Sequence, residues 1–277
     1  MKLKEAVDIL SKAEIADPLR EARLIFSQLS GLKQYELLSP EAVSDSESLT
    51  EAVYRRAKRE PLQYILGKAY FYRECYKVTN DVLIPREDTE ILVDYAVKSI
   101  PRGSRFLDLC TGSGCIALSV LNNTEKTTAI AVDLSEKALE IAKENSKELN
   151  LSSRVSFIHA DATKKIDGCG KFFAVLSNPP YVTKKAYDTL EKEIYFEPRM
   201  AFVGGEDGGD FYRQITPIYK DMLEDGGFIA YEIGYDQGEL IQNVAREHGM
   251  IAEIIKDFSQ NDRVAVLRKQ KDPLPEK

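Results

Sequence analysis

Histidine is scarce in this chain of 277 residues, and its cysteines do not form CxxC pairs. His159 and His248 are the only histidines, and the four cysteines stand at Cys75, Cys110, Cys115 and Cys169. Protein zinc sites need several such ligands at short, regular spacings. We therefore expect no metal site, and we expect the cysteines to be the reduced thiols of a cytoplasmic protein.

Long apolar runs and an excess of positive charge are also absent. No apolar segment approaches the 18 residues of a transmembrane helix. Residues 1–15 carry charges throughout, which predicts an amphipathic helix and not a signal peptide. The net charge is −7, whereas proteins that grip nucleic-acid phosphates usually carry a basic excess. We expect a monomer that binds neither a membrane nor nucleic acid directly.

The first part of the chain has the apolar spacing of helices. Ser48 and Glu51 have the spacing of a capping box and predict the start of one helix, which Pro61 is expected to end. The basic cluster at 55–59 at the end of that helix is either a contact surface for an acidic partner or a favourable match to the helix dipole. The expected domains are a helical one over 1–65, a hairpin linker over 66–86 and a main domain over 87–277.

Beyond residue 87, the expected strands and helices alternate, which predicts a parallel, doubly wound α/β sheet. The last two expected strands are joined by a short turn around Gln260 and Asn261, which favours an antiparallel hairpin at the sheet edge. The expected strands are 105–109, 128–132, 155–158, 172–176, 228–232, 251–255 and 264–267. The fold class is therefore α/β, with a mainly parallel sheet and an antiparallel edge strand.

A glycine-rich turn follows the first of these strands. Residues 108–114 read Asp-Leu-Cys-Thr-Gly-Ser-Gly, and Gly112 and Gly114 let the backbone turn tightly and a ligand approach. Asp133 ends the next strand, where a carboxylate can accept both hydroxyls of a ribose. Asp161 follows the third strand, where it can accept from an adenine amino group. Together these features predict a nucleoside-containing ligand at the carboxyl ends of the strands.

The loop alone leaves alternatives open. NAD prefers three glycines spaced as GxGxxG, and the alanine that ends Gly-Ser-Gly-Cys-Ile-Ala at 112–117 is tolerated at the third position. Asp108 and Asp133 can also be read as residues that only cap helices or solvate strand ends. The motif after residue 177 carries the choice between these interpretations.

That motif is Asn178-Pro179-Pro180-Tyr181, directly after an expected buried strand. Two prolines cannot continue a central strand, and the carbonyl of Pro179 is left free to face a ligand. The side-chain carbonyl of Asn178 stands beside it, so the pair can accept both N–H bonds of one NH₂ group. Tyr181 offers a flat face for a planar amide or base. A rigid turn with a helix-capping asparagine is the structural alternative.

The segment 108–114, Asp133 and the motif 178–181 together resemble the Rossmann-like, class I amino methyltransferases. Further segments resemble the HemK/PrmC family, the protein-(glutamine-N5) methyltransferases of peptide chain release factors. These segments are Pro61-Leu-Gln-Tyr-Ile-Leu-Gly67, Leu83-Ile-Pro-Arg-Glu-Asp-Thr-Glu90, Glu197-Pro198, Gly205-Glu-Asp-Gly208 and Tyr231-Glu-Ile-Gly234. The resemblance covers nearly the whole chain and is weakest over its first fifty residues.

The resemblance implies a helical N-terminal domain that docks the release factor and a site that methylates the glutamine of its Gly-Gly-Gln motif, which modulates translation termination. It implies S-adenosylmethionine as cofactor and S-adenosylhomocysteine as product. Asn178, Pro179, Pro180 and Tyr181 would then hold and orient the glutamine amide. The cofactor-binding residues would be Asp108, Cys110, Thr111, Gly112, Ser113, Gly114, Asp133, Asp161, Ala162 and Asn178. Cys110 stands where many members have glycine, and Ala162 stands where some have a large aromatic residue.

Two other functions remain as alternatives. An adenine-N6 DNA methyltransferase would present the same planar NH₂ group to the motif at 178–181, but such enzymes need a basic DNA-binding surface. A non-catalytic protein that binds the cofactor and a partner is the other alternative, and the intact motif argues against it.

Overall fold

The structure, a computed structural model, describes residues 1–33, 35–39, 41–44 and 46–270. It divides into two compact units. The helical unit comprises residues 1–68 together with 191–196, and the sheet unit comprises 69–190 and the described residues from 197 onward. The last residues of the expected main domain, 271–277, lie outside the described residues.

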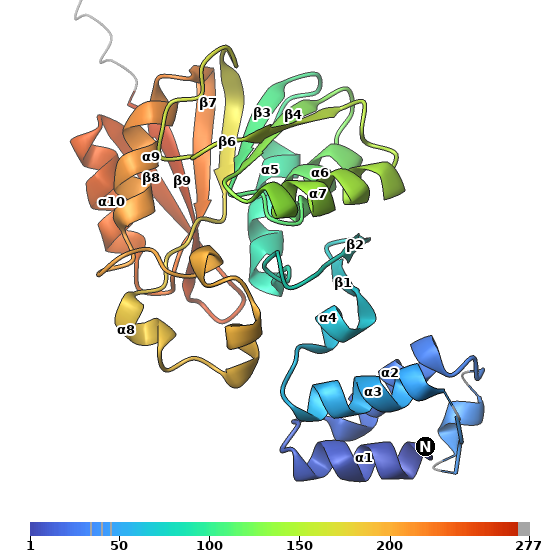
Figure 1. Ribbon diagram of the computed structural model, residues 1–277. Coiled ribbons are helices and arrows are strands. Elements are labelled where there is room, and N and C mark those ends of the chain that lie inside the picture. The colour runs from blue at the N-terminus through green and yellow to red at the C-terminus, as the bar shows by residue number, and fades with distance from the viewer. Residues whose placement is uncertain (34, 40, 45, 271–277) are drawn as a thin grey trace, which may run out of the picture. The chain divides into compact units, whose positions relative to one another are not determined.

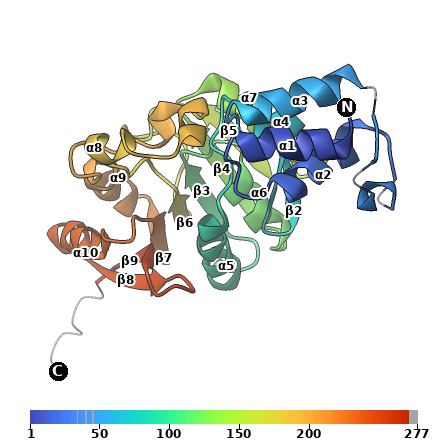
Figure 2. The same cartoon turned by 90° about the horizontal axis from the view of Figure 1, so that it is seen from below.

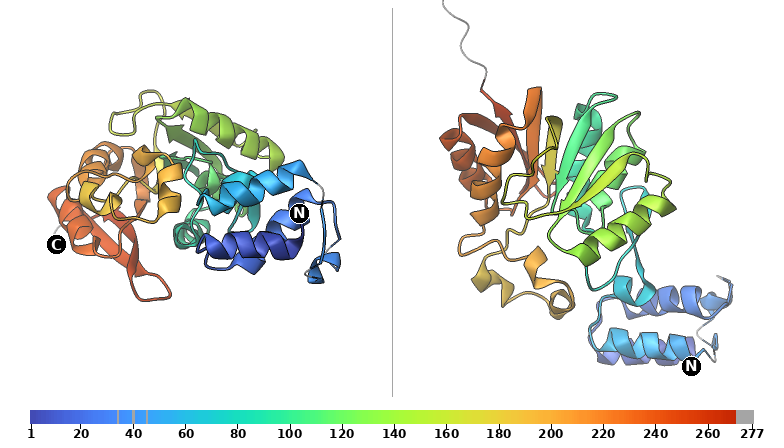
Figure 3. Two further views of the ribbon diagram at one scale, coloured as in Figure 1. Left: turned by 60° about the horizontal axis from the view of Figure 1, so that its bottom comes forward. Right: turned by 45° about the horizontal axis from the view of Figure 1, so that its top comes forward.

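The helical unit is built from short amphipathic helices (Figures 1 and 3). They are α1 (Leu3–Lys12), α2 (Pro18–Leu29), α3 (Glu47–Ala57) and α4 (Leu62–Leu66), with a 3-10 turn, η1, at Glu36–Leu38. Pro18 occupies the first position of α2, where its missing N–H has no intrahelical partner to lose. The apolar faces of the helices meet in one core that includes Leu10, Ile25, Phe26, Leu49 and Val53.

The start of α3 differs from the prediction. Ser46, and not Ser48, is the N-cap, and its hydroxyl oxygen accepts from the Leu49 backbone N–H at 3.3 Å. The predicted capping box at Ser48 and Glu51 is therefore wrong, because Ser48 already lies inside the helix. Pro61 precedes a further short helix, α4, which was not predicted.

The three arginines of the basic cluster at the end of α3 form ion pairs inside the helical unit, whereas Lys58 is exposed. Arg56 has only 8% of its side chain exposed and pairs with Glu21 at 2.5 Å and with Glu193 at 3.1 Å. Arg59 also pairs with Glu193, at 2.9 Å, and Arg55 pairs with Glu60 at 2.5 Å. These arginines hold the unit together, so they do not form the open basic surface that one interpretation of the cluster required.

The sheet unit contains the expected α/β fold (Figures 1 and 2). A small hairpin of β1 (Lys68–Phe71) and β2 (Glu74–Lys77) leads into it, as predicted. The main sheet has the order β5-β4-β3-β6-β7-β9-β8. Its strands are β3 (Arg105–Leu109), β4 (Thr128–Asp133), β5 (Val155–His159), β6 (Phe172–Ser177), β7 (Leu223–Glu232), β8 (Met250–Lys256) and β9 (Asp262–Lys269).

The predicted mainly parallel sheet is confirmed, with a more exact position for its reversed strand. β9 pairs antiparallel with both β7 and β8. The hairpin partner β8 forms the edge, and the reversed strand lies one place further in. β3 lies between β4 and β6, so the strand order reverses at β3, and such switch points are where α/β sheets bind ligands.

Helices cover both faces of the sheet (Figures 1 and 3). α5 (Glu90–Ser99) and α6 (Cys115–Asn122) pack on one face in a core with Phe106 and Phe228. α9 (Asp210–Lys220) and α10 (Gly238–Glu247) pack on the other with Val175 and Ile229. α7 (Glu136–Glu148) packs along β4 and β5. None of the helices in the described part of the chain has the length and apolar composition to cross a membrane.

The remaining short elements precede α5 or follow the Asn-Pro-Pro-Tyr motif, and those after the motif were not predicted. They are η2 (Glu87–Thr89), α8 (Lys184–Tyr187), η3 (Lys192–Phe196) and η4 (Arg199–Ala201).

Candidate active site

A cavity opens in the sheet unit at the carboxyl ends of β3, β4, β5 and β6. Residues directly after these strands line it, together with the segments at 81–83 and 198–201. Its lining is Asp81, Val82, Leu83, Cys110, Gly112, Asp133, Leu134, Ser135, Ala138, Asp161, Ala162, Asn178, Pro180, Pro198, Met200, Ala201 and Phe211. A smaller adjoining cavity shares Leu83, Cys110, Gly112 and Asn178 and adds Thr111 and Ser113. The glycine-rich loop at 108–114, called the nucleoside loop below, and the Asn-Pro-Pro-Tyr motif at 178–181 therefore meet at the same cavity.

Asp108 fixes the glycine-rich loop through hydrogen bonds to its side chain. It is fully buried, and its Oδ2 accepts from the Thr111 hydroxyl at 2.5 Å and from the Ala117 N–H at 3.2 Å. These bonds tie the loop to the first turn of α6. Burial raises the pKa of Asp108 to about 7. Its Oδ1 has no partner among the described residues.

Gly112 and Gly114 have different structural roles. Gly112 has a φ of +55°, lines both cavities, and has open space where a Cβ would stand. Gly114 has a φ of +81°, but a Cβ there would meet the Ala142 Cβ at 3.1 Å. Gly114 thus lets α6 approach α7 and does not line either cavity. Cys110 adopts a φ of +58°, a region that favours glycine, and burial raises the pKa of its thiol.

Asp133 fastens the loop to the end of β4. Its Oδ2 accepts from the Gly112 N–H at 2.8 Å, and its Oδ1 accepts from the Ser135 N–H at 2.8 Å. Burial raises the pKa of Asp133, and these backbone N–H bonds act in the opposite direction. Each carboxylate oxygen retains a second lone pair, and the residue lines the cavity, so it can accept hydroxyl groups from a ligand.

The far wall of the cavity is a mixture of polar and apolar groups. Asp161 accepts from the Thr163 hydroxyl at 2.6 Å, and this bond lowers the pKa of Asp161. Ala162 is buried and lines the wall beside it. Leu134, which was not among the predicted site residues, also lines the cavity and is 54% exposed. The sequence held one signal for this apolar wall, because Leu134 directly follows Asp133, the acid that ends β4.

The motif after β6 is held at several points. The Ser177 hydroxyl donates to the Leu109 carbonyl at 2.8 Å, joining the ends of β6 and β3. Asn178 lines both cavities, and its Nδ2 donates to the Thr89 hydroxyl oxygen at 3.3 Å. Pro180 lines the main cavity, whereas Pro179 does not appear in its wall. A Cβ on Gly204 would stand 2.3 Å from the Pro180 carbonyl oxygen, so only glycine fits against the motif there.

Tyr181 has a different setting from the one expected. Its ring packs against the apolar core beneath α9 and α10, and its hydroxyl donates to Glu232 Oε1 at 3.1 Å. Its backbone carbonyl accepts from the Gln237 side chain at 3.1 Å. Burial raises the pKa of Tyr181 well above its ordinary value. Tyr181 therefore anchors the end of the motif and does not line the cavity.

A buried carboxylate for which the sequence predicted no role, Glu197, joins two walls of the cavity. Glu197 is 5% exposed, accepts from the Ile84 N–H at 2.9 Å and binds the Arg86 guanidinium. These contacts connect the segment before α5 with the segment at 198–201. Both segments contribute lining residues.

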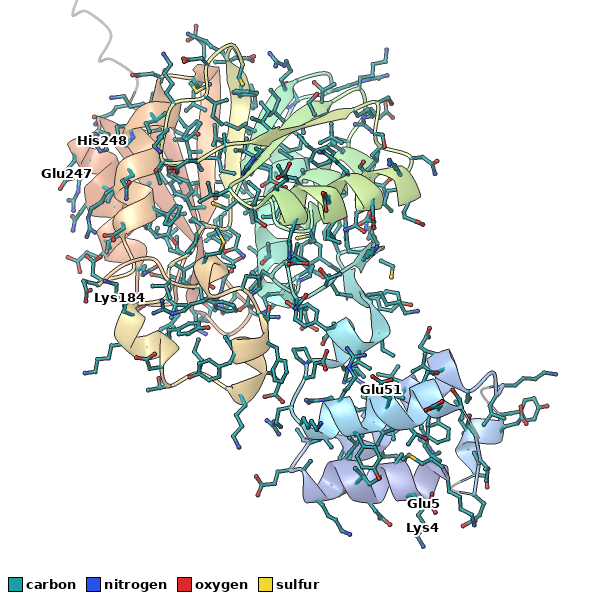
Figure 4. All side chains as sticks on the ribbon, in the orientation of Figure 1. Lys4, Glu5, Glu51, Lys184, Glu247 and His248 are labelled. Carbon is teal, nitrogen blue, oxygen red and sulfur yellow. The ribbon has the colours of Figure 1, made fainter. Side chains whose placement is uncertain are left out.

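The histidines stand apart from the motif. The exposed His159 ring contacts the Leu134 carbonyl at 2.9 Å. His248 follows α10 and precedes β8, so it lies at the edge of the sheet where the parallel strands begin (Figure 4). Neither histidine lines the two cavities.

Comparisons with known proteins agree with this geometry. Residues 87–200 match the family described as Methyltransferase small domain, and residues 2–67 match the PrmC N-terminal domain. A solved methyltransferase from Pyrococcus furiosus aligns with a TM-score of 0.51 at 20% identity, over 69% of this chain and 86% of that chain. The ribosomal protein L11 methylase from Lactobacillus delbrueckii aligns with a TM-score of 0.50 at 16% identity, over 67% and 81%. The fold and the matched domain define a methyltransferase.

Curated relatives narrow this class. A release factor glutamine methyltransferase from Caulobacter vibrioides is 37% identical over 272 residues, which cover 94% of this chain and 93% of the relative. One from Thermodesulfovibrio yellowstonii is 40% identical over 266 residues, covering 91% and 93%. The chain therefore belongs to the family of release factor glutamine methyltransferases. The resemblance stated from the motifs is confirmed.

Proposed function

We propose that this chain transfers the methyl group of S-adenosylmethionine to the side-chain amide nitrogen of the glutamine in the Gly-Gly-Gln motif of release factors, and so modulates translation termination. The observation that carries the proposal is the position of Asn178, which lines both cavities beside the nucleoside loop. The release-factor relatives support the choice of glutamine over a nucleic-acid base.

The residues of the main cavity fit the cofactor. Asp133 can accept the ribose hydroxyls, while Leu134 and Ala162 supply apolar surface for the adenine. Gly112 has open space where a side chain would obstruct a ligand. Bound S-adenosylmethionine supplies a methyl carbon on a positively charged sulfur. Asp108 and Gly114 do not line the cavities and fix the conformation of the loop, and Thr111 both bonds to Asp108 and lines the smaller cavity.

Asn178 and the Pro179 carbonyl are proposed to accept the N–H bonds of the glutamine amide. An amide nitrogen is a weak nucleophile because its lone pair is delocalised, and positive charge develops on it during methyl transfer. Fixed carbonyl dipoles directed at its hydrogens stabilise that charge without reorganisation. The alignment of nitrogen and methyl carbon lowers the barrier further, by up to about 7–11 kcal/mol in well-oriented systems. A methylated amide cation is strongly acidic, so water suffices to take its proton.

The helical unit is proposed to help hold the release factor, and its match to the PrmC N-terminal domain supports this role. We propose that the enzyme acts as a monomer in the cytoplasm, where its substrates function, without a direct nucleic-acid partner. The free state of all four cysteines fits a reducing compartment.

The test is incubation of the protein with methyl-labelled S-adenosylmethionine and a purified release factor, with mass spectrometry to locate the added methyl. We expect one methyl on the glutamine of the Gly-Gly-Gln motif. A release factor with this glutamine changed to asparagine is the matched control and should remain unlabelled. Labelling of an adenine-containing DNA duplex but not of the release factor would refute the proposal.

A further inference from the structure

A buried carboxylate lies behind the Asn-Pro-Pro-Tyr motif. Glu232 ends β7, is 1% exposed and does not line either cavity. It is paired with no cation among the ion pairs of the described residues. Its oxygens instead accept from two hydroxyls, that of Thr89 at 2.5 Å and that of Tyr181 at 3.1 Å. Burial raises the pKa of Glu232, so the position is costly for a carboxylate.

The hydrogen bonds of Thr89 determine which end of the Asn178 side-chain amide faces Thr89. Thr89 is 2% exposed in η2, 143 residues from Glu232 in sequence. A hydroxyl has one proton to donate, and Thr89 donates it to Glu232. Only its lone pairs then remain for Asn178, so Asn178 must present its NH₂ group to Thr89, as observed at 3.3 Å.

The direction matters because an amide has a donor end and an acceptor end. With its NH₂ group held by Thr89, Asn178 has its carbonyl oxygen available for a ligand. Without the acceptor at Glu232, the Thr89 hydroxyl could turn and donate to Asn178. The amide would then rotate and offer N–H bonds where a substrate NH₂ group needs an acceptor, and two donors would face each other.

We propose that Glu232 is a positioning residue, which acts through Thr89 to fix the carbonyl of Asn178 as the acceptor of the substrate nitrogen. Through the Tyr181 hydroxyl, the same carboxylate holds the other end of the motif. The inference deepens the proposed function and rests on it for the identity of the substrate. It assigns a role to the Tyr-Glu-Ile-Gly segment at 231–234 that the cofactor and substrate contacts do not require.

The kinetic test compares near-isosteric variants. Thr89→Val removes the hydroxyl and Thr89→Ser keeps it, while Glu232→Gln keeps the shape but adds a donor. We expect Thr89→Val and Glu232→Gln to lower kcat by about tenfold or more with the cofactor Kd within about twofold of the wild type. Thr89→Ser should retain most of kcat. In an Asn178→Ala background, Thr89→Val should have no further effect, because its action passes through Asn178.

Thr216→Val is the matched control. Thr216 is a fully buried threonine in α9, and its hydroxyl bonds to Tyr231 at 3.1 Å, with no link to Asn178. It should keep its kcat while losing similar stability. The relay from Glu232 through Thr89 to Asn178 is refuted by any of three results. These are a kcat of Thr89→Ser as low as that of Thr89→Val, a weaker cofactor Kd in place of a lower kcat, or a kcat of Glu232→Gln equal to that of the wild type.

A second measurement does not depend on the substrate. In isotope-labelled protein, the Asn178 side-chain NH₂ signal, assigned with Asn178→Ala, should show slow exchange and contacts to the Thr89 methyl group by NMR. Thr89→Val and Glu232→Gln should abolish the slow exchange, and Thr216→Val should not. Fast exchange in the wild type would overturn the relay. A wild type that fails to methylate release factors but shows the protected NH₂ group would refute the proposed function and leave the relay standing.

Discussion

The acids at the strand ends of the sheet unit are held differently from the acids around the buried arginine of the helical unit. In the helical unit, the buried Arg56 is matched by two carboxylates, Glu21 and Glu193. In the sheet unit, the buried Glu197 is also paired with a cation, Arg86. The acids at the strand ends differ: the buried Asp108 and Glu232 and the half-buried Asp133 accept from hydroxyls and backbone N–H groups. The ion pairs neutralise charge and hold helices together. The second arrangement fixes loops and an amide at the strand ends through hydrogen bonds, which is typical of a ligand site.

The largest expected effect tests whether the hydrogen bonds at the strand ends of the sheet unit serve methyl transfer. Asn178→Ala removes the acceptor and should lower kcat by about 100- to 1,000-fold, the range seen when one transition-state hydrogen bond is deleted. Cofactor Kd by calorimetry should change little. Activity near the wild-type level would mean that the network orients nothing that matters for methyl transfer.

A smaller effect is expected on cofactor binding. Asp133→Ala should weaken binding of S-adenosylmethionine by about 1.5–3 kcal/mol, because hydrogen bonds to a charged group are lost. Titration calorimetry measures this change. Glu247→Ala, an exposed acid at the end of α10 (Figure 4), is the control and should bind normally. An unchanged Kd for Asp133→Ala would remove this residue from the cofactor site.

A change to the ion pairs of the helical unit should affect the stability of the protein and not the rate of methyl transfer. Arg56→Met leaves Glu21 without its cation and Glu193 with Arg59 alone, and should lower the free energy of unfolding by about 2 kcal/mol. This is below the ~3–5 kcal/mol of fully buried pairs, because these carboxylates are 19% and 17% exposed. Urea unfolding measures the change, and Lys2→Met, which breaks the exposed pair with Glu41, should have a much smaller effect. Equal losses in the two variants would contradict the comparison.

The most gradual effect is on the pH dependence of stability. Burial raises the pKa of Asp108 from 3.8 to about 7, so the folded state holds this proton more tightly than the unfolded chain. The stability that Asp108 contributes is therefore full below about pH 4 and is lost as the pH rises to about 7. Asp108→Asn cannot ionise, so its stability should rise relative to the wild type across this range in urea titrations. The exposed variant Asp225→Asn should run parallel to the wild type, and parallel curves for Asp108→Asn would contradict the assignment.

Local signals in the sequence were sufficient for much of the sheet unit. The strand ends that carry Asp108, Asp133 and Asn178 could be located because each strand runs into a glycine, an acid or a proline with a distinct conformational role. Caps and chain order were harder. Ser46 and Ser48 are equally good caps by composition, and only the extended backbone at Ser46 distinguishes them. The place of β9 between β7 and β8 depends on pairing, which no local pattern records.

The supports of the site escaped prediction because they are non-local. Thr89 meets Glu232 across 143 residues, and Ile84 meets Glu197 across 113. A single sequence gives the donors and acceptors but not which of them are brought together. The same applies to Tyr181, whose expected place beside the substrate followed from its motif, while the structure puts its hydroxyl on Glu232.

The return of residues 191–196 to the helical unit has a practical consequence. The polypeptide passes between the two units three times, near residues 68, 190 and 196. A protease cut near residue 68 would therefore yield a nicked protein whose N-terminal fragment stays attached through the grip of Arg56 and Arg59 on Glu193. A fragment of residues 1–68 made alone would lack Glu193, so Arg56 and Arg59 would lose a carboxylate partner that the intact helical unit supplies.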